Sequence, residues 1–258
     1  MMFCTIWISE EVWDVIIVFL LIVIAHAGLS AFNIITKKKP VRHNNEVAGI
    51  IFGVITLIYS LIIAFVIIAV WQNYEDLNET IENEAADLNT VLVHSNILPD
   101  SLKNSVDLAI ENYCEKVVTE EWGVSENHIR LRESAVPSLR LLLFKAQVNG
   151  EIQPSLITVL DENLTNITRL REQRLNHTRA YVPPLVWTTL TIGSILVVCF
   201  SYFLYMESVL LKRIFLSFLW GMIGMSLFLI YMLDHPFDGS GHVSKEPYEL
   251  IIQLLTEN

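Results

Sequence analysis

Four long apolar stretches dominate the pattern of hydrophobic and polar positions along the chain. They cover residues 15–35, 47–71, 182–206 and 214–233, and none of them contains Asp, Glu, Lys or Arg. A helix that crosses a bilayer needs about 20 consecutive, mostly apolar residues. The pattern therefore predicts four membrane-spanning helices. A signal peptide is not expected at the N-terminus, because acidic residues stand where its basic region would be and the apolar stretch is too long.

A different pattern fills the region between the second and third apolar stretches. Apolar residues recur there every three or four positions, which is the spacing of one face of an amphipathic helix. Leu77 and Ile81 follow Trp71 closely, so the second spanning helix is expected to continue out of the membrane. Further helix boundaries are expected at Pro99, Gly123, Pro137 and the Asn149-Gly150 pair.

The expected fold class is all-α, because no alternating strand pattern competes with the helical spacing. We expect a polytopic membrane protein with four transmembrane helices and a helical extramembrane domain between the second and the third. Residues 1–71 would hold the first and second transmembrane helices, and residues 72–181 the extramembrane domain. Residues 182–233 would hold the third and fourth transmembrane helices, and residues 234–258 a C-terminal tail.

Composition and charge agree with a membrane protein and narrow the possible partners. The chain is 53% hydrophobic and only 17% charged, whereas soluble domains carry about 25% charged residues. Its net charge of −11 argues against nucleic acid, whose phosphates need a basic surface. The acidic residues 75–87 are expected to form a solvated helix face rather than a calcium site, because no Asp-x-Asp-x-Asp-Gly loop accompanies them.

No enzyme, cofactor or metal site is expected. The sequence has no Gly-x-Ser-x-Gly, His-Glu-x-x-His, glycine-rich phosphate loop or Cys-x-x-Cys motif. Cys4, Cys114 and Cys199 are too far apart to suggest a zinc site or a disulfide framework. The apolar stretches also lack the carboxylates and basic residues that usually mark a proton pump or an ion-coupled transporter.

The second apolar stretch carries the residues most suggestive of a pore. Gly49 and Gly53 form a G-x-x-x-G pair, which lets two helix backbones approach closely. The pair would serve either packing among the four helices of one chain or a shared axis in an oligomer. Phe52, Tyr59 and Phe65 stand among Ile, Val and Leu and could form a hydrophobic constriction that gates by dewetting.

Polar residues mark two ends of the predicted spans. His43, Asn45 and Glu46 precede the second span, where Asn45 or its neighbour Asn44 would cap the helix and Glu46 would complement its dipole. A ring of Glu46 around an oligomer axis would attract cations. A compact turn after the fourth span contains Asp234, His235, Pro236, Phe237 and Gly239. Asp234 and His235 alone are too few ligands to predict a metal site.

The basic residues favour one orientation of the chain in the membrane by a narrow margin. A dense basic cluster follows the first span and a basic pair precedes the fourth: Lys37, Lys38, Lys39, Arg42, Lys212 and Arg213. The opposite side carries the arginines between Arg169 and Arg179. Because basic loops tend to stay in the cytoplasm and the residues before the first span are acidic, both termini and the extramembrane domain are expected to face away from it.

Three segments together resemble a known family. They are HNNEVAG (residues 43–49), continuing through Phe52, Gly53 and Tyr59 to Trp71, the basic run from Arg171 to Arg179, and LDHPFDG (residues 233–239). The chain resembles the bacterial bestrophin-like membrane proteins over about residues 10–245. The resemblance implies a build like that of bestrophins, which are pentameric anion channels. In bestrophins the helical region and both termini are cytosolic, which is opposite to the orientation that the charges favour.

Two functions follow as expectations. The first is an oligomeric ion channel, an anion channel if the resemblance holds, in which the second span lines the pore. The alternative is a non-conducting sensor or scaffold whose helical domain binds a ligand or partner. In either case we expect a multi-pass protein in the lipid bilayer of a bacterial inner membrane. We also expect a homo-oligomer, and the resemblance implies that it is a pentamer.

Overall fold

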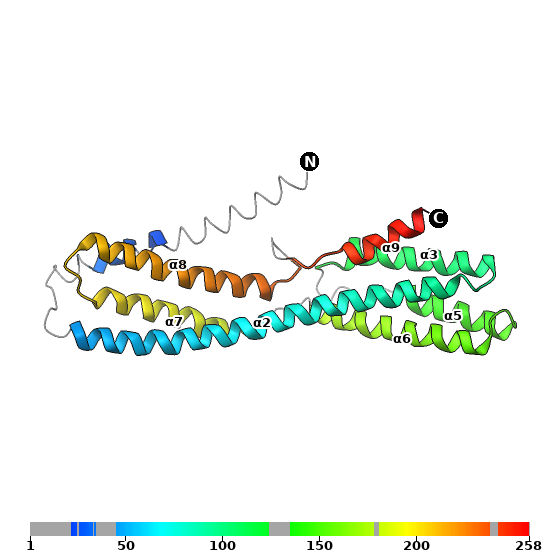
Figure 1. Cartoon of the computed structure of the whole chain (residues 1–258), viewed down its shortest axis with the longest axis horizontal. Coiled ribbons are helices and arrows are strands. Elements are labelled where there is room, and N and C mark those ends of the chain that lie inside the picture. Colours follow the sequence, from blue (N-terminus) through cyan, green and yellow to red (C-terminus); the bar gives the residue numbers. More distant parts are fainter. Residues whose placement is uncertain are drawn as a thin grey trace. The chain divides into compact units, whose positions relative to one another are not determined.

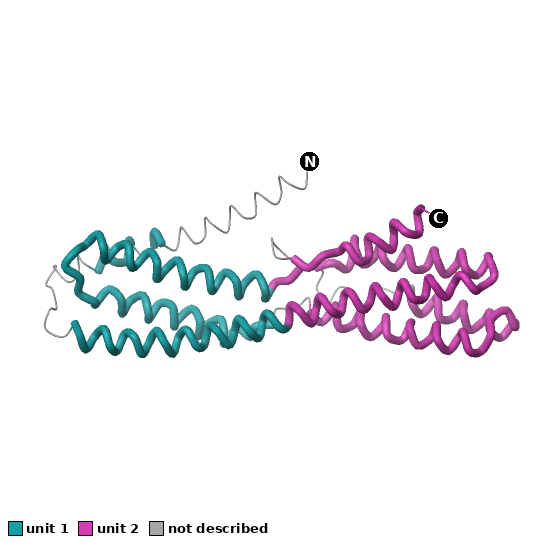
Figure 2. The backbone as a smooth tube through the Cα atoms, viewed as in Figure 1, with its two compact units in different colours: residues 1–72, 181–234 teal, residues 73–180, 235–258 magenta. Residues whose placement is uncertain are grey.

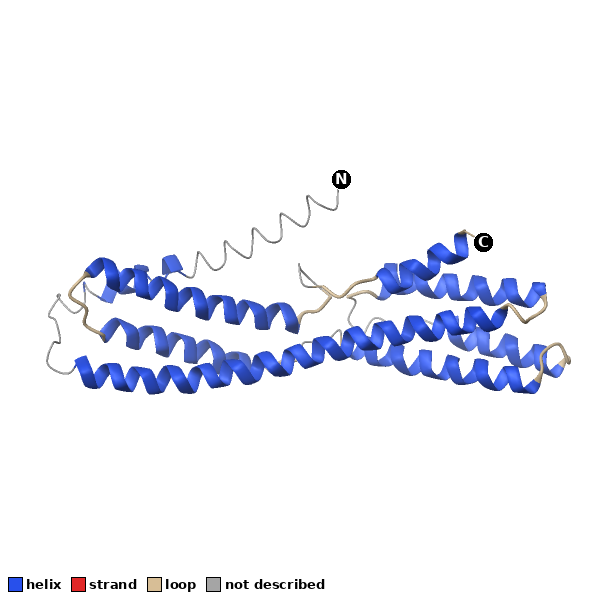
Figure 3. Cartoon of the chain, viewed as in Figure 1, coloured by secondary structure: helices blue, strands red, loops and turns tan. Residues whose placement is uncertain are grey.

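The computed structural model describes residues 22–24, 26–32, 34, 45–123, 135–177, 181–237 and 242–257, and these residues form helices and no strand (Figures 1 and 3). The helices are α2 (Asn45–Ser95), α3 (Asp100–Lys116), the π-helical turn η1 (Val117–Glu121), α5 (Ala135–Val148), α6 (Pro154–Asn176), α7 (Pro184–Phe203), α8 (Val209–Asp234) and α9 (Glu246–Thr256). The all-α fold class is confirmed.

The chain divides into two compact units (Figure 2). Unit 1 comprises residues 1–72 and 181–234, and unit 2 comprises residues 73–180 and 235–258. Helix α2 runs without interruption for 51 residues and contributes to both units, which confirms the predicted continuation of the second span. The four-part division expected from the sequence stays a prediction.

Unit 1 contains the apolar helices. Within the described residues, α2, α7 and α8 are long and apolar enough to cross a membrane. The first predicted span lies partly outside the described residues, and the structure shows a shorter apolar helix there, Ile22–Phe32. The count of four spans therefore stays a prediction. Helix α7 begins at Pro184, as expected for a residue whose missing N–H has no helical partner at this position.

Unit 2 is a helical bundle around one apolar core. The core side chains recur at intervals of three and four on each helix, for example Leu77, Ile81 and Leu88 on α2 and Leu160, Leu164 and Ile167 on α6. Such spacing places them on one face of each helix. These faces pack together and exclude water from the core.

The predicted boundaries of unit 2 hold with one shift. Pro99 precedes α3, and Gly123 and Gly150 adopt positive φ angles of 71° and 79°, which glycine tolerates without a Cβ clash. Helix α5 starts at Ala135, two residues before the predicted start at Pro137. Proline fits there because the first turn of a helix has no partner for its N–H.

The C-terminal tail holds an element that the sequence pattern did not reveal. Helix α9 lies within residues 234–258, and its Tyr248 and Ile251 are buried in the core of unit 2. The sequence analysis assigned no element to this tail, because a helix of eleven residues offers only a short stretch in which a period can be recognised.

Candidate functional site

Helix α2 is the least covered of the apolar helices. Only 6% of its most apolar 18-residue stretch is buried, against 33% for α7 and 22% for α8. Six of its exposed apolar side chains recur every three or four positions and so lie on one face: Ile50, Val54, Leu57, Leu61, Phe65 and Ile68. We call these six residues the open face of α2. Ile51 and Ile58 are exposed beside them. The open face needs apolar cover from lipid or from other copies of the chain, including copies of the same face around a shared axis.

The G-x-x-x-G pair does not pack within the described part of the chain. A Cβ placed on Gly49 or Gly53 would have no neighbour within 4 Å among the described residues. Two roles were expected for this pair: packing within one chain, or contact at a shared axis in an oligomer. No contact among the described residues supports packing within one chain.

Close packing inside unit 1 relies on two other glycines that the sequence motif did not single out. A Cβ on Gly193 would lie 2.5 Å from the Tyr59 ring, and one on Gly28 would lie 2.7 Å from the Tyr202 hydroxyl. These distances are too short for any side chain, so both helices approach their neighbours at a glycine. A glycine on α7, rather than one on α2, brings these two helices together.

The three aromatic pore candidates divide between two faces of α2. The Phe52 ring stacks on Phe200 of α7, with centroids 5.9 Å apart and planes at 16°. Tyr59 is buried, and its hydroxyl donates to the Leu190 carbonyl oxygen at 2.9 Å. Phe65 is 69% exposed and belongs to the open face. Phe52 and Tyr59 thus hold α2 against α7, and of these three candidates Phe65 is the exposed one.

The polar residues before the second span are only partly within the described structure. Asn45 is the first residue of α2, and its side chain accepts from the Tyr205 amide at 2.7 Å and donates to the Tyr205 carbonyl at 3.1 Å. It therefore bonds to the α7–α8 connection rather than to the first amides of its own helix. Glu46 lies exposed in the first turn of α2, as expected for a residue that complements the helix dipole. His43 and Asn44 lie outside the described residues.

Asp234 after the fourth span is a buried structural acceptor. Its carboxylate accepts from the Val182 amide at 2.8 Å and from the Trp187 indole nitrogen at 3.1 Å, which ties the end of α8 to the start of α7. In unit 2, the Phe237 ring meets Trp122 edge to face at 5.4 Å, and the Pro236 carbonyl accepts from Val243. Gly239 lies outside the described residues. No group of three or more potential metal ligands occurs among the residues that the structure describes.

Unit 2 contains a buried charge network that sequence reasoning missed. The Arg174 guanidinium on α6 donates to both oxygens of Glu84 on α2, at 3.0 and 3.2 Å, and to Glu121 in η1 at 3.0 Å. The Arg174 and Glu84 side chains are completely buried. Arg171 is partly buried and forms a bidentate ion pair with Glu121, its shortest contact being 2.6 Å. Two carboxylates and two guanidiniums thus balance in charge inside the bundle.

Two tyrosines complete the network. The Tyr113 hydroxyl on α3 donates to Glu84 at 2.6 Å, and the Arg174 guanidinium lies 5.6 Å from the centroid of the Tyr248 ring on α9. Burial, to which the Glu84 charge adds, raises the pKa of both phenols well above the usual value, so both stay protonated. The network therefore joins α2, α3, η1, α6 and α9 through charge-assisted contacts.

The carboxylate of Glu121 is held in its charged form. Burial alone would raise its pKa, but the hydrogen bond from Arg171 and the charge of Arg174 outweigh burial and place the pKa below its ordinary value. Burial likewise opposes the charge of Arg174, but the Glu84 carboxylate keeps the pKa of the guanidinium well above its usual range. Glu121 and Arg174 are therefore both charged at neutral pH.

The sequence held a signal for this network. Glu84 falls in the series 77, 81, 84, 88 and 91, and Arg171 and Arg174 fall in the series 160, 164, 167, 171 and 174. Both series alternate by three and four, which is the spacing of a buried helical seam. The expectation that residues 75–87 form only a solvated face is therefore wrong for Glu84. Charged residues at seam positions were the mark of an internal ion pair.

Cys114 lies beside this network and should be inert in the folded protein. Its side chain is fully buried, and burial, followed by the Glu84 charge, raises the pKa of its thiol to about 12. In a variant that retains Cys114 alone, we expect no modification by a water-soluble maleimide at pH 7 until the protein is unfolded. An otherwise cysteine-free Glu115→Cys variant, which places a thiol at the next and exposed position, should react without unfolding. Equal labelling of both variants in the folded state would contradict the burial of Cys114.

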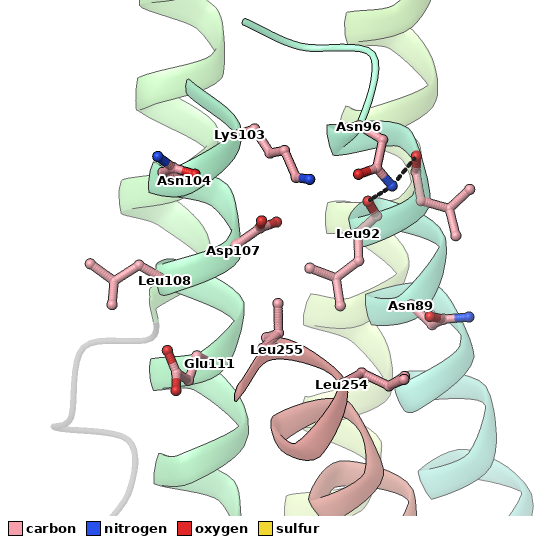
Figure 4. Close-up of a pocket in the computed structure, with 11 residues that line it drawn as sticks. Asn89, Leu92, Asn96, Lys103, Asn104, Asp107, Leu108, Glu111, Leu254 and Leu255 are labelled. Atoms are coloured by element: carbon pink, nitrogen blue, oxygen red, sulfur yellow. Dashed lines mark hydrogen bonds between the residues drawn. The ribbon is translucent and has the colours of Figure 1, made fainter. Parts of the chain in front are cut away.

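A pocket of about 570 Å³ opens elsewhere in unit 2, among α2, α3 and α9 (Figure 4). Lys103 and Asp107 of α3 point toward its interior, and Leu92 of α2 and Leu255 of α9 face them. Glu111 of α3 also lines the pocket, so one basic and two acidic side chains stand beside an apolar wall. Such a lining suits a small molecule that carries both charges and an apolar part.

Comparison with known proteins identifies the family. A sequence model of the family described as a bestrophin-like domain matches residues 19–248. A comparison with curated protein sequences finds no match.

The fold is similar to solved structures of a bacterial bestrophin homologue from Klebsiella pneumoniae. One, with an isoleucine-to-threonine mutation, has a TM-score of 0.70 and 11% identity, and the match covers 94% of this chain and 99% of that chain. Another, solved by zinc anomalous phasing, has a TM-score of 0.68 and 12% identity over 96% and 98% of the two chains. At this identity the likeness establishes the fold alone. Because the family match spans most of the sequence, the chain belongs to the bestrophin-like family.

Proposed function

We propose that the protein is an oligomeric ion channel of a bacterial inner membrane, with α2 lining the pore. Membership of the bestrophin-like family supports this proposal, because bestrophins are pentameric anion channels. The resemblance favours an anion as the conducted ion and a pentamer as the assembly. The absence of enzyme motifs in the sequence agrees with a channel rather than an enzyme.

The main observation in support of the proposal is that most of α2 in unit 1 is exposed. This helix exposes an apolar face, and its Gly49 and Gly53 have open space beside them among the described residues. Glycine pairs of this kind allow the close approach of a second helix. Copies of α2 arranged around an axis would use the glycines at their mutual contacts and would turn the open face toward the centre.

Such a pore would be gated by apolar side chains. Residues 47–71 contain no charged side chain, so a central pathway lined by them would have a hydrophobic constriction that opens and closes with its hydration. Phe65 is the largest side chain of the open face and is the proposed constriction residue.

Conductance of the purified protein in planar bilayers tests the proposal. We expect discrete ion currents, and we expect the Phe65→Ala variant to increase the open probability or the conductance several-fold because it removes the bulkiest apolar group of the pathway. Phe218→Ala is the matched control, since Phe218 on α8 is the same residue type with the same 69% exposure. It should conduct like the unmodified protein. Silence of a correctly assembled protein under all salts and voltages would contradict the channel.

The alternative is a non-conducting sensor, and the pocket of Figure 4 is the observation that favours it. Lys103 and Asp107 could hold the two charges of a small zwitterion against the leucine wall. A ligand that raises the melting temperature of the protein, without any current in bilayers, would favour the sensor. Loss of that effect in the Asp107→Asn variant would locate the ligand in this pocket.

A further inference from the structure

A second pocket lies in unit 1, at the end where α2 begins and α7 connects to α8. It has a volume of about 380 Å³, which is within the range of about 300–1,000 Å³ typical of ligand sites. Its walls are mainly apolar and include Gly49, Phe52, Leu204, Phe215 and Leu219. These residues belong to helices that cross the membrane or to their connection, so the apolar wall continues into the lipid region.

Lys212 is the cationic residue in the wall of this pocket. Its ammonium group donates to the carbonyl oxygens of Tyr202 at 2.9 Å and Leu204 at 2.8 Å, at the C-terminal end of α7. These contacts satisfy the last carbonyls of the helix, as basic residues often do. An ammonium group has three donors, however, and acceptors among the described residues use two of them. The carbonyls thus fix the ammonium group at the pocket, with one donor left for an acceptor in it.

The position of the pocket places Lys212 at the level of lipid headgroups. The pocket contains the first residue of α2, Asn45, and the residues that follow the last turn of α7, and these ends are tied by the Asn45–Tyr205 hydrogen bonds. Helix ends that leave the hydrocarbon core lie in the headgroup region of a bilayer. The carboxylates of Glu46 and Glu207 stand at the same end, but both are exposed and neither lines the pocket.

We propose that this pocket binds one anionic phospholipid per chain. The lipid phosphate accepts a hydrogen bond from the third donor of Lys212, and an acyl chain runs along the wall formed by Phe52, Phe215 and Leu219. A free phosphate ion would satisfy the ammonium group but would leave this apolar wall without cover, so the wall favours the lipid. Basic pockets between transmembrane helices are known to recognise anionic lipid headgroups.

Native mass spectrometry of the purified protein with added phosphatidylglycerol or phosphatidylcholine tests this proposal. We expect the unmodified protein to retain one phosphatidylglycerol per chain in preference to phosphatidylcholine. The Lys212→Met variant should weaken phosphatidylglycerol retention about tenfold, as expected for the loss of one hydrogen bond to a charged group. It should leave phosphatidylcholine retention unchanged. The matched control is Arg213→Met, because Arg213 is the adjacent basic residue and does not line the pocket.

A second variant keeps the test decisive if Lys212→Met does not fold. Leu219→Trp retains the ammonium group but fills the apolar part of the pocket, so it should reduce retention of the lipid. Equal phosphatidylglycerol retention in the unmodified protein and in Leu219→Trp or Lys212→Met would overturn the proposal. Release of the lipid by excess inorganic phosphate would also overturn it, because the site would then be one for the phosphate ion.

Discussion

Replacing Arg174 with Met should lower the free energy of unfolding by about 3–5 kcal/mol, since removal of one partner leaves a buried charge uncompensated. The substitution deprives Glu84 of a bidentate partner and Glu121 of one of its two arginines. Neither Arg174 nor Glu84 has any contact with solvent, so water cannot replace the lost contacts. Denaturant unfolding of the detergent-solubilised protein, followed by circular dichroism, measures the change.

Two further variants separate the buried charge from a general effect of substitution. Arg169→Met removes an exposed arginine of the same helix and should change the free energy of unfolding by no more than about 0.5 kcal/mol. The Glu84→Met, Arg174→Met double variant should be more stable than Arg174→Met alone, because no unpaired charge remains at Glu84. If Arg174→Met is no more harmful than Arg169→Met, the buried network does not stabilise the protein as described.

The second large effect is expected at the contact between α2 and α7. A Gly193→Leu variant should have a free energy of unfolding lower by about 1–3 kcal/mol, which is the usual effect of an overfilled core. The added side chain would overlap the Tyr59 ring, which is itself fixed by burial and by the hydrogen bond of its hydroxyl to the Leu190 carbonyl. Thermal unfolding in detergent, at a fixed protein concentration, measures this loss.

Gly53→Leu is the control for this variant and tests the role of the G-x-x-x-G pair. Within the described part of the chain nothing lies near Gly53, so the folding of each chain should be unaffected. The same variant should weaken the oligomer, which light scattering after size-exclusion chromatography would detect. If Gly53→Leu unfolds the chain as Gly193→Leu does, Gly53 serves packing within the chain instead.

These glycines show which packing contacts a sequence pattern can predict and which it cannot. The G-x-x-x-G spacing identified a surface able to approach another helix, but spacing alone could not say which helix would use it. The close contact inside unit 1 falls on the isolated Gly193, whose importance depends on the Tyr59 ring of another helix. Such long-range complementarity leaves no local pattern in the sequence.

The helices of unit 2 were predicted well where their pattern was apolar and poorly where it was charged. The seam of leucines and isoleucines predicted the helices of unit 2, because one face of each helix must exclude water. Glu84 and Arg174 occupy the same seam, but their roles depend on each other across 90 positions of the chain. Either residue read alone is typical of a helix surface, and only their common seam positions indicate burial.

Water access to the open face of α2 tests the central proposal most directly. The three native cysteines would be replaced by alanine, and single cysteines introduced at Leu61 and Phe65 on α2 and at Phe218 and Met222 on α8. All four positions are at least half exposed in the single chain. If α2 lines a pore, a charged methanethiosulfonate reagent should modify the two α2 cysteines in liposomes and alter the current, while the two α8 cysteines stay unmodified in lipid. Equal protection of all four cysteines would contradict a pore lined by α2.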